Sequence, residues 1–187
     1  MTGKKDSWPR LIWSLLALEV GWFACVLGAA WNAHWLSVLV VSLLAVIHGL
    51  IVERDRLLPA MLLAMASLAV GLVADTVLIT IGAYQPNRWI MPSPVATIWL
   101  LMLWVNFSLA LNESLKWLQQ HLFAAAILGS IFGPMAYLAA KRLGAVRMEE
   151  PVGGRLFVLG LGWLIAMPLI SLIAAVVNDR YGRLRNT

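Results

Sequence analysis

Carboxylate and amide side chains lie inside the apolar runs of this chain. Glu19 and Asp75 interrupt two such runs, and Asn106, Asn112 and Glu113 interrupt a third. In a bilayer each of these groups is costly to bury without a partner, so each is a hypothesis for a functional site. Such groups can anchor the polar part of a ligand or carry a proton. The alternative is an interhelical hydrogen bond that only fixes the packing.

Motifs for several other chemistries are absent from the sequence. It has no phosphate-binding glycine loop, no HExxH zinc motif and no serine in the pattern of an activated nucleophile. His34, His48 and His121 are not clustered as a di-iron oxygenase requires. The single Cys25 excludes an intrachain disulfide and a thiolate metal cluster. We therefore predict neither a metal nor a cofactor, which leaves carboxylate or amide chemistry, or no chemistry.

The composition is that of a protein dissolved in lipid. Hydrophobic residues make up 61% of the chain and charged residues 12%, against about 25% charged in an average soluble domain. A soluble protein of this length needs a more polar exterior. The basic residues behind the net charge of +5 lie in short flanks between apolar runs. This position favours anionic lipid head groups as their partners, and it does not suggest nucleic acid.

Six apolar segments are long enough, or nearly so, to cross a bilayer as helices, which takes about 20 residues. They are residues 11–30, 35–52, 57–81, 95–115, 122–140 and 156–177. The connections between them are short, so consecutive helices should be antiparallel neighbours. We predict an all-α membrane protein, with residues 1–187 forming one domain, a compact bundle of six transmembrane helices.

Six spans place both termini on one side of the membrane. That side would carry Lys4, Lys5, Arg10, Arg54, Arg56, Lys116, Arg180, Arg183 and Arg185, and the other side Arg88, Lys141, Arg142, Arg147 and Arg155. Nine of the 14 Lys and Arg residues would thus lie on the same side of the membrane as the termini. Because cytoplasmic loops are enriched in Lys and Arg, we expect both termini in the cytoplasm.

Helical periodicity places some of the polar residues on shared faces. In the third segment Ser67, Gly71 and Asp75 line one face, and small residues there let a neighbouring helix or a ligand approach closely. For Asp75 we favour a functional role over packing. Glu113 can instead reach the membrane interface and pair with Lys116 one turn on.

The fourth segment carries Asn106, Ala110 and Glu113 on one face, and Asn106 falls near the bilayer midplane. Glu19 falls at a similar depth in the first segment, where a protonated, paired acid and a functional acid are equally good interpretations. His48 lies near a helix end, where we expect a solvated or hydrogen-bonded ring.

Two further features concern the fifth segment and the longest apolar connection. Pro134 cannot donate to the Ser130 carbonyl, so we expect a bend in the helix at that point, of the kind that most often serves packing. The connection at 82–94 is too irregular for a helix and too apolar for a free loop. We expect it to fold back over the outer ends of the bundle close to Asp75, as a lid or as an interfacial plug.

Several stretches together resemble a bacterial integral-membrane family catalogued as domain of unknown function 2878. They are 21–28 (GWFACVLG), 71–75 (GLVAD), 104–117 (WVNFSLALNESLKW), 133–137 (GPMAY) and 142–145 (RLGA). The resemblance covers most of the chain between the first and last segments, and it implies the bacterial inner membrane. Members of this family are often encoded beside lipid-modifying enzymes that resemble cyclopropane-fatty-acid synthase, which implies a lipid role and such an enzyme as partner.

The resemblance also ranks the candidate residues. Asp75, Asn112, Ser114, Pro134 and Tyr137 match the family's pattern. At the positions of Glu19 and Glu113, the family often has a glutamine and a histidine respectively. This departure puts in doubt whether either carboxylate is essential.

Our leading hypothesis is an inner-membrane bundle that binds or modifies a lipid or isoprenoid, or assists an enzyme that does. The candidate ligand-binding residues are Asp75, Asn112, Ser114, Tyr137, Asn106, Glu19 and Glu113. A small-solute or proton-coupled transporter and an interaction scaffold without a ligand site are the alternatives, and enzyme activity is left open. Convergence of Asp75, Asn112 and Tyr137 on one cavity favours a site, and separate pairing favours packing.

Overall fold

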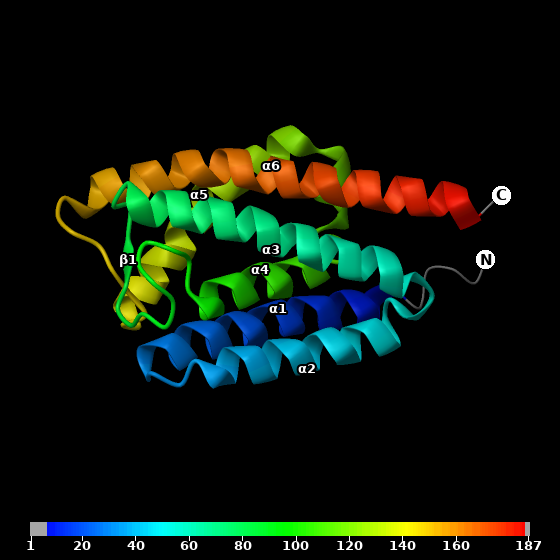
Figure 1. Ribbon diagram of the computed structural model, residues 1–187. Coiled ribbons are helices and arrows are strands. Elements are labelled where there is room, and N and C mark those ends of the chain that lie inside the picture. The colour runs from blue at the N-terminus through cyan, green and yellow to red at the C-terminus, as the bar shows by residue number, and fades with distance from the viewer. Residues whose placement is uncertain (1–6, 186–187) are drawn as a thin grey trace.

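A computed structural model describes residues 7–185 of the protein. These residues form six α-helices: α1 (Ser7–Ala30), α2 (Trp35–Ile51), α3 (Leu57–Thr80), α4 (Ile98–Leu111), α5 (Leu122–Arg142) and α6 (Val152–Arg185) (Figure 1). The connections add two 3₁₀ helices, η1 (Arg54–Arg56) and η2 (Lys116–Gln120), and two short strands, β1 (Gln85–Pro86) and β2 (Val146–Arg147). The predicted all-α class is therefore confirmed.

Four of the helices are long and apolar enough to cross a membrane. Their spanning stretches are Trp8–Ala30, Leu57–Thr80, Leu122–Arg142 and Val152–Tyr181. The predicted spans 35–52 and 95–115 correspond to α2 and α4, which have only 17 and 14 residues. At about 1.5 Å per residue they are shorter than the hydrocarbon core of about 30 Å. The chain is thus a helical membrane protein with four helices of full spanning length within residues 7–185.

The short helix α4 lies at the centre of the bundle. It packs against α1, α2 and α3, and no residue from Ile98 to Leu111, all of which the structure describes, is exposed. Because other helices shield α4 from lipid, the bilayer thickness does not set its length. The helix ends before residue 115 because the N–H groups of Glu113 and Leu115 both bond to the Ala110 carbonyl in a tight turn. We predicted that Asn106, Ala110 and Glu113 share one helix face. This prediction is wrong for Glu113, which lies beyond the end of α4.

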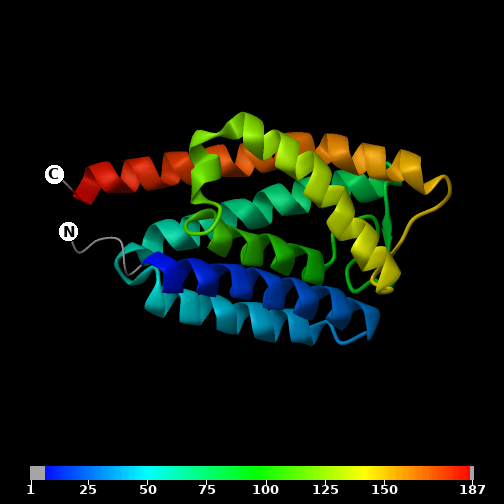
Figure 2. The ribbon, with the colours of Figure 1, turned by 180° about the vertical axis from the view of Figure 1, so that it is seen from behind.

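The outer helices pack in pairs around this centre. The helix α6 runs along α5 and α3, whereas α2 runs along α1 (Figures 1 and 2). Among the described helices, α5 makes at most isolated contacts with α1 and α4. The beginning of α1 and the end of α6 lie at the same end of the bundle. Lys4 and Lys5 lie outside the described residues, and the side chains of Arg183 and Arg185 are not described.

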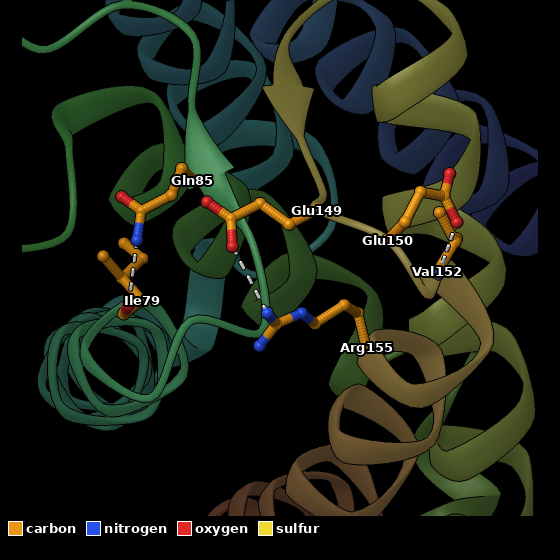
Figure 3. Close-up of polar contacts among 6 residues, drawn as sticks. All are labelled: Ile79, Gln85, Glu149, Glu150, Val152 and Arg155. Atoms are coloured by element: carbon orange, nitrogen blue, oxygen red, sulfur yellow. Dashed lines mark hydrogen bonds and ion pairs between the residues drawn. The ribbon is translucent and has the colours of Figure 1, made fainter.

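The connections at the opposite end are tied together. Strands β1 and β2 pair antiparallel, with Gln85 opposite Arg147, and so link the α3–α4 connection to the α5–α6 connection. The Gln85 amide donates to the Ile79 carbonyl at 3.1 Å, and Arg155 pairs with Glu149 at 3.4 Å (Figure 3). The strand pairing and the Gln85 bond hold the 81–97 connection at this end of the bundle, where the sequence predicts it, and the Arg155–Glu149 pair holds the α5–α6 connection.

Proline 134 lies inside α5, which runs unbroken from Leu122 to Arg142. The Ser130 carbonyl, which Pro134 cannot bond, lies 3.2 Å from the position that a Cβ atom on Gly160 would occupy. A glycine of α6 therefore accommodates the carbonyl that the proline leaves free. This arrangement accords with the packing role expected for Pro134.

Candidate functional site

The carboxyl group of Asp75 is the point where four parts of the chain meet. Asp75 is buried, with 1% of its surface exposed, near the end of α3. Its Oδ1 atom accepts hydrogen bonds from the hydroxyl of Tyr84 at 2.8 Å and from the hydroxyl of Tyr137. Its Oδ2 atom accepts the indole N–H of Trp104 at 2.7 Å. We call these four residues the Asp75 centre.

Each donor to Asp75 comes from a different element. Tyr84 belongs to the connection that folds over the bundle, Trp104 to α4 and Tyr137 to α5. The rings of Tyr84 and Tyr137 lie 4.6 Å apart between centroids. Burial raises the pKa of Tyr84 well above its ordinary value, and the nearby Asp75 charge raises it further, so Tyr84 stays a neutral donor.

Two glycines let tryptophans lie flat against the helices beside this centre. A Cβ atom on Gly71 would overlap the indole of Trp104, and one on Gly133 would overlap the indole of Trp163. The two indoles stack with their centroids 5.2 Å apart and their planes 3° from parallel. The small residues of the predicted face on α3 thus permit the close approach that brings Trp104 to Asp75.

A cavity of about 560 Å³ lies beside the Asp75 centre. It is bounded by α1, α4, α5 and α6, and its lining is mostly apolar and aromatic, including Trp22, Trp99, Trp104, Phe107, Phe132 and Trp163. Its polar lining residues are Glu19, Asp75, Asn106 and Tyr137. The volume falls within the range of about 300–1,000 Å³ that is typical of ligand pockets.

The cavity opens between α1 and α5. Glu19 of α1 and Phe132 and Met135 of α5 line it and are also exposed, the two apolar side chains by 58% and 56%. The separation of α5 from α1 and α4 accounts for this opening. Both helices at the mouth are apolar and long enough to span a membrane, so the mouth is at the side of the bundle.

Two of the polar lining residues belong to the contact between α1 and α4. The Asn106 amide donates to the Leu18 carbonyl at 2.8 Å and lies directly against Gly21, where any side chain would overlap it. The Asn106 Oδ1 atom is buried and has no partner in the described part of the chain. Glu19, in contrast, is exposed at the mouth and makes no hydrogen bond or ion pair with the side chains that the structure describes.

The other polar candidates lie outside the cavity lining, in what we call the Asn112 cluster. It consists of Asn112, Ser114, Asn178, Gln119 and Glu53. The Asn178 amide donates to Asn112 Oδ1 at 2.8 Å and to Gln119 Oε1 at 3.4 Å. Glu53 is buried, which raises its pKa, and a hydrogen bond with the Asn112 side chain opposes this rise. The side chains of Asn112, Asn178, Gln119 and Glu53 thus satisfy one another at the turn after α4.

Two neighbours complete the surroundings of the Asn112 cluster. The Ser114 hydroxyl pairs with Ser14 of α1 at 3.0 Å. Glu113 is half-buried and feels the charges of Arg10, Lys116 and Arg56. Among the described side chains it forms no ion pair with Lys116, so the expected pairing one turn along is not present.

The structure therefore divides the predicted residues into two groups. Asp75, Tyr137, Asn106 and Glu19 line one cavity, whereas Asn112, Ser114 and Glu113 lie elsewhere. Of the three residues whose convergence would favour a site, Asp75 and Tyr137 line one cavity and bond to each other, whereas Asn112 is paired separately, so this criterion is met only in part.

Sequence reasoning did not single out Tyr84 and Trp104 as partners of Asp75. Two features of the sequence could have indicated these partners. The small residues Ser67 and Gly71 before Asp75 leave room for a large neighbour such as Trp104, and the apolar connection predicted close to Asp75 contains Tyr84. His48 also differs from expectation, because it is buried and its ring nitrogens have no partner among the described residues. It shares the inward face of α2 with Ser37, Val41 and Leu44, and the spacing of three and four residues turns it away from solvent.

All the cavity-lining candidates fall within one match to a family model. Among curated proteins and among solved structures, none is significantly similar to this chain. A family model described as protein of unknown function (DUF2878) matches residues 11–169. The match covers most of the 187 residues, and the chain therefore belongs to the DUF2878 family.

Proposed function

We propose that the protein binds an amphiphile of the lipid or isoprenoid type in the cavity beside the Asp75 centre. The observation that carries this proposal is an apolar cavity of about 560 Å³ whose mouth lies between α1 and α5. An apolar chain that moves from the lipid into such a space stays in apolar surroundings and keeps its van der Waals contacts. Its polar end would then lie near Glu19 and Asp75.

The proposed setting is the bacterial inner membrane, with the chain as one domain of six spans. The shorter helices α2 and α4 would cross as part of the bundle. Both termini would lie in the cytoplasm, because the beginning of α1, which carries Arg10, and the end of α6 share one end of the bundle with Arg54 of η1 and Lys116 of η2.

Binding is favoured over chemistry by the state of Asp75. Both of its oxygens already accept hydrogen bonds, from Tyr84, Tyr137 and Trp104. A ligand would have to displace one of these donors before Asp75 exchanged a proton with it. We therefore propose that the protein holds an amphiphile, and that it presents this ligand to a lipid-modifying enzyme.

The test fills the cavity and measures the bound lipid. Full-length protein is extracted from membranes in a mild detergent and its co-purified lipids are quantified by mass spectrometry. Ala136 lines the cavity, so Ala136→Phe should lower the bound lipid several-fold. Ala69→Phe adds the same ring at an exposed site on α3 and should leave the amount unchanged. Equal lipid in all three proteins would overturn the proposal.

A proton-coupled carrier is the second candidate, and Glu19 is the observation that favours it. An ionisable side chain without a partner, halfway along a membrane helix and facing a cavity, is typical of a proton pathway. The test is proton movement in proteoliposomes under an imposed pH gradient. A flux that Glu19→Gln abolishes supports a carrier, and no flux above empty vesicles removes this candidate.

A further inference from the structure

We infer that the ligand of this cavity carries a cationic nitrogen, of the alkylammonium class, which the Glu19 carboxylate holds at the mouth. This inference rests on the proposed binding function and narrows it to one class of head group. It follows from three features of the cavity. Its charged lining residues are acids, its strongest hydrogen-bond donors are already in use, and an aromatic ring lies beside Glu19.

The charges of the lining residues are of one sign. Glu19 and Asp75 are acids, and the described residues around the cavity include no Lys, Arg or His. An ionised carboxylate in the middle of a membrane helix is costly unless a cation lies close to it. Among the side chains that the structure describes, none supplies that cation to Glu19. A positively charged head group at the mouth would supply it.

The strongest hydrogen-bond donors near the cavity are already in use. The hydroxyls of Tyr84 and Tyr137 and the indole N–H of Trp104 all donate to Asp75. The remaining side-chain donors in the lining are neutral: the Asn106 amide, and indoles such as Trp99, whose N–H is buried and has no partner among the described residues. A phosphate, sulfate or carboxylate head would meet two acids and no cation, so the cavity disfavours anionic amphiphiles.

The aromatic walls suit a cation as well. Trp22 lies three residues after Glu19 on α1, which places both side chains on the same side of the helix. Trp104 and Trp163 also line the cavity, but they stack on each other and lie against Gly71 and Gly133, so their faces are covered. The face of the Trp22 ring carries negative electrostatic potential and attracts ammonium groups within about 6 Å. The Glu19 carboxylate and the Trp22 ring therefore select the same kind of head group.

The experiment compares three probes that differ only in their head group. Full-length protein in nanodiscs of zwitterionic phospholipid is titrated with doxyl-labelled octadecyl chains that end in an ammonium, a hydroxyl or a sulfate, and quenching of tryptophan fluorescence is measured. We expect the ammonium probe to bind about tenfold more tightly than the alcohol, with the sulfate weakest. The net charge of +5 attracts the sulfate, so general electrostatics works against this order.

Two variants assign the preference to Glu19. Glu19→Gln should lower the affinity for the ammonium probe about tenfold and leave the alcohol unchanged, because only the ion pair is lost. Glu19→Asp should keep the preference for ammonium. Because Glu19 is exposed and unpaired in the described chain, neither change should disturb folding.

The outcomes separate the inference from the function on which it rests. If no probe quenches wild-type protein beyond the level of Ala136→Phe, amphiphile binding in the cavity itself is wrong. If the alcohol or the sulfate binds as tightly as the ammonium, or if Glu19→Gln leaves the ammonium affinity unchanged, the cationic ligand is wrong and cavity binding stands.

Discussion

The Asp75 centre and the Asn112 cluster both gather polar side chains from distant parts of the chain, but they differ in their surroundings. Asp75 is a single acid that accepts from three aromatic donors and lies beside an apolar cavity. The Asn112 cluster joins amides and a buried acid at the turn after α4, and none of its members lines the cavity. Similar interruptions of an apolar run can thus lie beside a cavity or close the end of a helix.

The largest difference between the two regions should come from removing their central residues. Asp75→Ala leaves three buried donors without an acceptor, so we expect a loss of about 3 kcal/mol or more in the free energy of unfolding. Asn112→Ala should cost about 1 kcal/mol or less, as is usual for interhelical hydrogen bonds in membranes. Unfolding of full-length protein by SDS in mixed micelles measures both. Equal losses would remove the distinction between the regions.

The next effect concerns the glycine that admits Trp104 to the Asp75 centre. A methyl group on Gly71 would overlap the Trp104 indole, so Gly71→Ala should cost about 1–3 kcal/mol. The matched control is Gly153→Ala in the first turn of α6, where a Cβ atom would meet nothing within 4 Å. The control should be neutral or stabilising by up to about 1 kcal/mol. Similar destabilisation by both would mean that the close contact at Gly71 has no importance of its own.

A smaller loss of stability should show that Tyr84, in the 81–97 connection, belongs to the Asp75 centre. Tyr84→Phe removes one donor to Asp75 and should cost about 1 kcal/mol. In a double-mutant cycle with Asp75→Asn, the two changes should not add, since they share one contact. A cycle of Tyr84→Phe with Ser114→Ala, in the other region, should be additive. Coupling to Ser114 rather than to Asp75 would contradict this assignment.

The smallest effect belongs to the Asn112 cluster and depends on pH. Because burial raises the pKa of Glu53 above its ordinary 4.5, the folded state holds this proton more tightly than the unfolded state. Its contribution to stability is therefore present below pH 4.5 and is lost as the pH rises through the folded-state pKa. Glu53→Gln should flatten this part of the stability profile in SDS unfolding from pH 4 to 8. A wild-type loss that the variant shares would exclude Glu53 as its source.

Much of the helical arrangement follows from apolar segments of sufficient length. The predicted spans overlap all six helices, but they define where hydropathy changes and not where hydrogen bonding stops. The helix α6 extends to Arg185, beyond the predicted 177, because polar residues continue a helix readily outside an apolar core. The pairing of β1 with β2 joins residues about 60 positions apart and has no local pattern that predicts it.

The candidate site was predictable in part, for reasons that differ between residues. Asp75 stands out because an acid in an apolar run is costly, and the small residues before it indicate a close neighbour. Which donors reach Asp75 depends on how α4 and the 81–97 connection pack, and sequence spacing does not specify this. The cavity depends on the separation of α5 from α1 and α4, which is a property of the whole bundle.

The central claim, that an amphiphile occupies the cavity, is tested most directly by photolabelling. Full-length protein in nanodiscs is irradiated with a long-chain alcohol that carries a diazirine in its alkyl chain, and labelled residues are mapped by mass spectrometry. Met167 lines the cavity and is 6% exposed, whereas Met65 on α3 is 65% exposed and outside the lining. We predict label on both residues in wild-type protein, and loss of the Met167 label alone in Ala136→Phe. Label on Met65 without label on Met167 in wild-type protein would contradict the claim.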